Sequence, residues 1–170
     1  MTSEIDDFKA VFESGFARAN RYKIIFPNGP EKLSIICDSA TWPGRQMLTS
    51  DRVTNMNQTK VAYSFDQEDL TVSFILGNDW LAWEYLDNWQ NDVIRGLENV
   101  IGFEVNYKSD YTRGDVILQH LDTENLVRKE VTFKNVFPTT LNSIELGNAN
   151  TGDVIRVTAT FSYDNWETTR

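Results

Sequence analysis

Polar and apolar residues alternate over two stretches near the end of the chain. Over residues 127–134, Val127, Val131 and Phe133 share one face, and over residues 155–163, Val157 and Phe161 do the same. A period of two with β-branched and aromatic residues predicts strands with one face in a core. Proline cannot donate to a strand ladder, so Asn-Val-Phe-Pro should end the first strand, and the turn-forming residues of 146–153 should reverse the chain. We therefore predict two antiparallel strands, either paired directly or lying in facing sheets.

Further strands are predicted upstream by the same alternation. Residues 20–27 and 32–38 flank Asn-Gly-Pro-Glu and predict one hairpin, and residues 59–65 and 70–76 flank Asp-Gln-Glu-Asp and predict a second. Shorter strands are expected at residues 101–107 and 115–121, joined by a polar turn. The total is seven or eight strands, all antiparallel because the connections are short.

One convincing helix is predicted over residues 79–95. Its apolar positions recur at helical spacing and form one stripe, which we expect to pack on the sheet: Trp83, Leu86, Trp89 and Val93. Strands with one flanking α-helix predict a mainly β fold, an antiparallel sandwich or small barrel.

Two segments do not fit this core. Residues 3–15 predict a short amphipathic helix carrying Phe8 and Phe12. Residues 39–58 have no sustained period, so we expect a long loop, and loops of that length are usually functional. Because Trp42 and Met47 are costly to leave in water, we expect this loop to be covered, for example by another subunit.

Composition fits one soluble domain spanning residues 1–170. The chain has 41% hydrophobic residues and no apolar run long enough for a membrane helix. Its acidic start lacks the features of a signal peptide, so we expect synthesis in the cytoplasm. Twenty-five acidic and 16 basic residues give a net charge of −9, which should repel nucleic acid rather than bind it.

Candidate catalytic chemistry is sparse. The single cysteine, Cys37, excludes an internal disulfide, and it lies in an apolar run far in sequence from the single histidine, His120. The acids Asp66, Glu68 and Asp69 are better explained as a solvated turn, and Asn148, Asn150 and Asp153 lack the glutamate that closes a calcium loop. We expect no enzyme activity, no cofactor and no metal site.

Five segments together resemble the tail tube proteins of contractile-tailed bacteriophages related to T4. The segments are 12–26, 63–76, 83–90, 127–146 and 154–167, and they follow the family's order over nearly the whole chain. Their most specific parts are the Glu-Ser-Gly-Phe-Ala-Arg start, the Val-Phe-Pro-Thr exit from a strand and the Asp-x-Trp-Glu end.

This resemblance implies hexameric rings that stack into a hollow tube inside a contractile sheath, with a fold like the Hcp protein of type VI secretion. One sheet of each subunit would join its neighbours in a closed barrel that lines the channel. By position, residues 39–58 correspond to the family's loop to the adjacent ring, and residues 1–19 to an arm that contacts neighbours. The resulting candidates for contacts between subunits are Phe8, Phe12, Trp42, Pro43, Arg45, Met47, Asp51 and Arg52.

The resemblance also implies partners and a location. These are further copies of the chain, the sheath, baseplate and tail terminator proteins, and a tape measure protein in the lumen, all in the virion tail. DNA would pass through the channel without specific binding, and the protein would not insert into a membrane. A net negative channel wall would keep the DNA from adhering.

Four other functions stay open. A baseplate protein that initiates the tube would share the fold but form one ring, and an Hcp-like protein would build a secretion tube. A ligand-binding barrel would need an apolar cavity, and a carboxylate enzyme would need two converging acids. The last two would be stable monomers.

Overall fold

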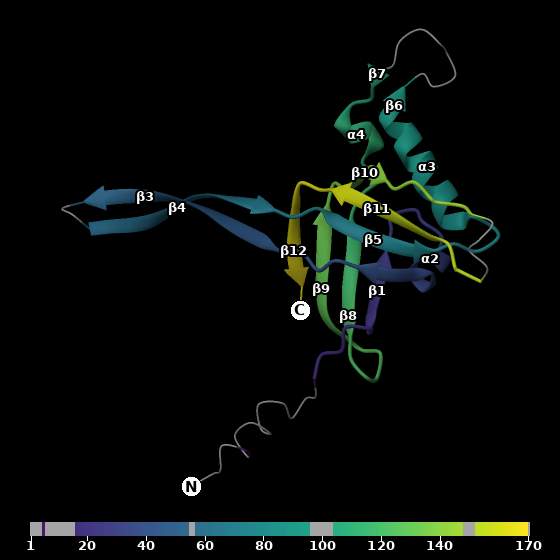
Figure 1. Cartoon of the computed structure of the whole chain (residues 1–170), viewed down its shortest axis with the longest axis horizontal. Coiled ribbons are helices and arrows are strands. Elements are labelled where there is room, and N and C mark those ends of the chain that lie inside the picture. Colours follow the sequence, from purple (N-terminus) through teal and green to yellow (C-terminus); the bar gives the residue numbers. More distant parts are fainter. Residues whose placement is uncertain (1–4, 6–15, 55–56, 96–103, 148–151, 170) are drawn as a thin grey trace.

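The protein is described by a computed structural model that covers residue 5 and residues 16–54, 57–95, 104–147 and 152–169. All strand pairs in these ranges are antiparallel. Two four-stranded sheets form the body, and a two-stranded hairpin projects from it (Figure 1). The predicted class, a mainly β antiparallel sandwich with a flanking helix, is confirmed.

Sheet A has the strand order β1-β8-β9-β12. Its strands are β1 (Tyr22–Ile25), β8 (Val116–Leu121), β9 (Val127–Lys134) and β12 (Asn165–Thr169). Val131 and Phe133 of β9 are fully buried, while Glu130 and Thr132 between them are partly exposed. One face of β9 therefore packs in the core, as the alternation over residues 127–134 predicts.

Sheet B has the order β10-β11-β5-β2. Its strands are β10 (Phe137–Leu141), β11 (Arg156–Ser162), β5 (Leu70–Ile75) and β2 (Cys37–Ala40). Val157, Ala159 and Phe161 of β11 are buried opposite Phe74, Val72 and Leu70 of β5. The two strands first predicted from the sequence thus lie in different sheets, which was one of the two arrangements left open.

The chain passes from sheet A to sheet B at Asn135-Val136. Asn135 has a φ of 52°, a left-handed conformation that asparagine tolerates, and the Val136 side chain is buried. This change of direction explains why β9 ends at Lys134 and a new strand begins at Phe137.

Helix α3 (Leu81–Val93) closes the core. Its residues Ala82, Leu86 and Trp89 are buried with the inner faces of both sheets, and its backbone lies close to β10 and β11. The described residues also contain two single-turn helices, α2 (Lys32–Ile35) and α4 (Lys108–Tyr111), and the short strands β6 (Ile94–Arg95) and β7 (Glu104–Val105).

The first predicted hairpin is wrong. Residues 32–35 form helix α2 rather than a strand, and β1 pairs with β8. Pro30 favours a helical first turn, and the amide of Leu33 donates to the Pro30 carbonyl at 3.0 Å. The β-branched residues Ile35 and Ile36 suggested a strand, but burial of Leu33 stabilises the turn.

The loop predicted at residues 39–58 is also wrong. This segment contains the end of β2, all of β3 (Arg45–Thr54) and the start of β4 (Asn57–Gln67), and β4 pairs with β3 rather than with β5. Strand β3 projects from the body and buries neither face in the core, so it lacks the alternation that identifies core strands.

Two other predictions need correction. In the range 101–107 the described strand is β7, two residues long, and α4 occupies the polar turn that follows. The described residues contain twelve strands rather than the predicted seven or eight, because several are short or belong to the hairpin.

Candidate assembly surfaces

Strands β3 and β4 form a hairpin that extends well beyond the two-sheet body (Figure 1). They pair along their length, from Arg45 opposite Gln67 to Thr54 opposite Asn57. The ten residues of β3 span about 33 Å at ~3.3 Å per residue. Such a projecting arm reaches a neighbouring molecule more readily than its own core.

The hairpin carries large apolar side chains in solvent. Tyr63 is 68% exposed and Met47 57% exposed, and the others are Trp42, Val61 and Phe65. Contiguous exposed apolar surface marks interaction sites. The alternation at residues 61–65, which we had assigned to a core, therefore belongs to this surface.

A β-bulge interrupts the hairpin. The register shifts between Leu48 and Thr49, so that Met47 lies opposite Phe65 whereas Ser50 lies opposite Val61. Side chains opposite each other share a face, so Phe65 and Val61 point to opposite faces. Apolar side chains are thus available on both faces of the arm.

Both strands of the hairpin are joined by short connections to strands of sheet B. Only residues 41–44 separate β2 from β3, and residues 68–69 separate β4 from β5. The β2–β5 pairing continues towards the hairpin, since the amide of Thr41 donates to the Thr71 carbonyl at 3.0 Å. The hairpin axis consequently follows the strands of sheet B, and in Figure 1 β5 and β11 also lie along the long axis, whereas β8, β9 and β12 run across it.

The base of the hairpin is clamped to sheet A. The Arg45 guanidinium lies between two aromatic rings, 4.9 Å from the centroid of Phe65 and 4.7 Å from that of Trp166. The Tyr163 hydroxyl donates to the Glu68 carbonyl at 2.6 Å, and burial raises the pKa of that phenol. These contacts fix the direction in which the arm leaves the body.

Each sheet also has two edge strands. β2 and β10 in sheet B, and β1 and β12 in sheet A, pair with a neighbouring strand on one side only within the described residues. Unpaired strand edges invite pairing with another chain. The fold therefore offers backbone edges, in addition to the hairpin, for assembly.

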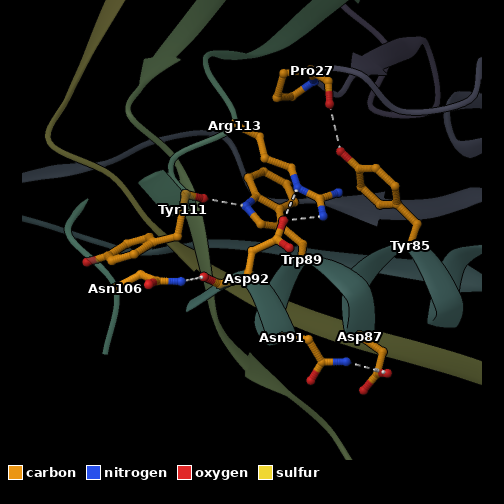
Figure 2. Close-up of polar contacts among 9 residues, drawn as sticks. All are labelled: Pro27, Tyr85, Asp87, Trp89, Asn91, Asp92, Asn106, Tyr111 and Arg113. Atoms are coloured by element: carbon orange, nitrogen blue, oxygen red, sulfur yellow. Dashed lines mark hydrogen bonds and ion pairs between the residues drawn. The ribbon is translucent and has the colours of Figure 1, made fainter. Parts of the chain in front are cut away.

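Helix α3 is seated by specific polar contacts (Figure 2). Trp89 is fully buried, and its Nε1 donates to the Tyr111 carbonyl of α4 at 2.9 Å. The Tyr85 hydroxyl donates to the Pro27 carbonyl at 2.8 Å, and burial raises the pKa of Tyr85 to about 12. The Arg113 guanidinium lies over both rings and donates from Nε to Asp92 at 2.9 Å.

The four apolar residues predicted to pack helix α3 on the sheet differ in burial. Leu86 and Trp89 are fully buried, whereas Trp83 and Val93 are half-buried.

The contact residues predicted outside the core occupy the hairpin or its root: Trp42 and Pro43 before β3, and Arg45, Met47, Asp51 and Arg52 within it. Phe8 and Phe12 lie outside the described residues. The sequence placed Val61, Tyr63 and Phe65 in a hairpin with residues 70–76 and did not indicate that they are exposed on the β3–β4 hairpin, nor that Trp166 contacts its base.

The single cysteine and histidine lie on different sheets. Cys37 is in β2, where burial raises the pKa of its thiol to about 11, so it is neutral at pH 7. His120 is in β8, and its Nε2 lies 3.1 Å from the Arg18 carbonyl. Within the described ranges, no three His, Cys, Asp or Glu residues are grouped to hold a metal ion, and no helix could span a membrane.

Comparison with known proteins identifies the family. Residues 9–169 match the family described as phage tail tube protein. The chain belongs to this family. It is 22% identical to the tail tube protein gp19 of Enterobacteria phage T4 over 166 residues, and 24% identical to that of phage T6. Each alignment covers 96% of this chain and 99% of the relative.

The fold of this tail tube family member also matches a solved assembly. A chain of the sheath-tube complex of the extracellular contractile injection system PVC, in its extended state, superposes with a TM-score of 0.67 at 17% identity. The match covers 99% of both chains. Hairpin, sheets and helix therefore belong to one shared fold.

Proposed function

We propose that the protein is the repeating structural subunit of a bacteriophage tail tube. Copies form rings, hexameric as the resemblance implies, and the rings stack into a hollow conduit through which the genome passes. The projecting β3–β4 hairpin carries this proposal, because it extends beyond the body and exposes Met47 and Tyr63 to solvent. We infer that it docks on the adjacent ring and buries these side chains there.

The surroundings of the tube follow from the same family. The PVC relative comes from a sheath-tube complex, which supports a sheath around the tube. We infer further contacts with baseplate and tail terminator proteins, a tape measure protein in the lumen, and a location in the virion tail after synthesis in the host cytoplasm. We also infer a single domain over residues 1–170, with residues 1–19 as a contact arm.

A non-enzymatic role is part of this proposal. The neutral Cys37 thiol contacts the Tyr22 hydroxyl and the Ser39 carbonyl, and Nε2 of His120 contacts the Arg18 carbonyl, so the two do not form a nucleophile and base pair. The interior between the sheets is occupied by aromatic side chains: Phe74, Trp89, Phe133 and Phe161. This packing argues for a structural subunit over a ligand-binding barrel.

Electron microscopy of the purified protein at rising concentration tests the assembly. We expect hollow tubes of uniform bore that lengthen with concentration. A single ring that never stacks would indicate a tube initiator, and a persistent monomer would contradict the proposal.

The hairpin is tested by the double substitution Met47→Ser and Tyr63→Ser. Both side chains are exposed in the single copy, so the folded subunit should keep its stability to within about 0.5 kcal/mol while tubes become shorter or absent. Tyr107→Ser, at a residue that is 81% exposed but off the hairpin, is the matched control. Equal tube lengths for the double variant and the control would show that the hairpin does not stack rings.

A further inference from the structure

The proposed tube leaves open which sheet borders the channel. We infer that sheet B does: β10 of one copy pairs with β2 of the next, and the outward face of sheet B is an electrically neutral, hydroxyl-covered wall. This inference rests on the proposed function. It replaces the net negative wall expected from total charge with a neutral one.

The first reason is the direction of the strands. The hairpin continues the β2–β5 pair, so an arm that reaches the adjacent ring aligns the strands of sheet B with the stacking direction. Their edges, β2 and β10, then face sideways towards neighbours in the same ring. The strands of sheet A run across the hairpin, so their ends rather than their edges would face those neighbours (Figure 1).

The second reason is that a ring of copies keeps neighbouring strands antiparallel all the way round. Sheet B contributes four strands, each antiparallel to the next. When copies are related by rotation, β10 of one and β2 of the next therefore run antiparallel. A closed barrel of this kind pairs both edges of sheet B that a separate copy leaves open.

The third reason is charge. Asp38 and Arg156 are the charged residues in the strands of sheet B, and they neutralise each other in an ion pair of 2.9 Å. The strands of sheet A carry six charged residues: Lys23, Arg128, Lys129, Lys134, Glu130 and Glu167. Arg128 and Lys134 form ion pairs with Asp122 and Asp115 beside the strands, but Lys23 and Lys129 are exposed and can bind phosphate. Sheet A would therefore interact with passing DNA more strongly than sheet B, whose two strand charges neutralise each other.

Side chains on the outward face of sheet B form two rows that cross the strands. One row joins Thr140, Thr160 and Thr71 by strand register and extends to Thr41, whose hydroxyl accepts from the Thr71 amide at 2.9 Å. The other joins Thr158, Ser73 and Ser39. Pairing of β10 with β2 would continue both rows from copy to copy into closed rings of hydroxyl groups, which bind water without attracting or repelling phosphate strongly.

Thiol labelling of assembled tubes tests this orientation. In a Cys37→Ser background, Thr160→Cys reports on the outward face of sheet B, and Thr132→Cys is the matched control on the outward face of sheet A. In tubes, a long polyethylene-glycol maleimide should label Thr160→Cys about tenfold or more slowly than in separated copies, because labelling requires an accessible thiolate. Thr132→Cys should keep its rate.

The outcomes separate the two proposals. Tubes in which the Thr160→Cys variant reacts as fast as in separated copies, or in which Thr132→Cys is the protected site, overturn the assignment of sheet B. Failure of both the unsubstituted protein and the Cys37→Ser background to form tubes counts against the tube subunit itself. A Thr160→Cys variant that alone fails to assemble is replaced by Thr158→Cys, on the same face.

Discussion

Asp122 organises the turn between β8 and β9 with one carboxylate. Its Oδ1 accepts from the amides of Leu126 at 2.9 Å and Glu124 at 2.8 Å, and its Oδ2 accepts from Nε of Arg128 at 2.7 Å. The Leu126 amide, then the Glu124 amide and Arg128, lower the pKa of Asp122. These bonds favour the ionised form in the folded state.

This lowered pKa predicts an acid-dependent stability term. Because the folded pKa lies below the unfolded value of about 3.9, the term is fully present above that value and is lost as pH falls through the folded pKa. Urea unfolding of the wild type and of Asp122→Asn, from neutral to strongly acidic pH, measures it. The wild type should be more stable at neutral pH and the two should converge in acid. A pH-independent difference would contradict this prediction.

Helix α3 depends on one tryptophan more than on the rest of its stripe. Trp89→Ala empties a fully buried site and should cost about 3–5 kcal/mol of unfolding free energy. Trp89→Phe keeps most of the packing but leaves the Tyr111 carbonyl without its donor, at a cost of about 1–3 kcal/mol. Denaturant unfolding provides the measurement. Trp83→Phe, at a half-buried position of the same helix, should cost less than Trp89→Phe, and the reverse order would refute this account.

At the scale of elements, the sequence predicted what the core buries. β5, β9, β11 and α3 each have an inner face that hydrophobic burial imposes on the pattern, so their existence and approximate limits were predictable. The β3–β4 hairpin buries neither face in this core, so β3 was predicted as a loop and β4 as a strand paired with the wrong neighbour. Strand partners were also missed, because alternation identifies a strand but not its neighbour.

The candidate site was predictable in position but not in form. Residues 39–58 were assigned to subunit contacts by the family resemblance, and Trp42 and Met47 by the cost of exposing them. The contribution of β4 was not, because Val61, Tyr63 and Phe65 alternate as a core strand does. Only the projecting geometry shows that they stay in solvent.

The whole molecule is a strong anion, and assembly brings many copies together. Each copy carries a formal charge of −9, so neighbouring copies repel one another. Raising ionic strength from 0.01 to 0.15 M shortens the screening length from about 30 to about 8 Å. The lowest protein concentration that yields tubes should therefore fall.

Sedimentation of tubes across that salt series, with sucrose as a non-ionic control, measures this effect. A threshold concentration that rises with salt would mean that ion pairs between copies outweigh the repulsion of their total charge.

The continuity of the hairpin with β2 and β5 also decides how the protein bears mechanical load. A pull on the hairpin tip is directed along these strands, while their ladder hydrogen bonds lie perpendicular to it. The bonds between β2, β5 and β11 are then loaded together in shear, rather than peeled open one at a time. A joint of this geometry would let a stack of rings transmit tension along its length without unravelling the subunits that form it.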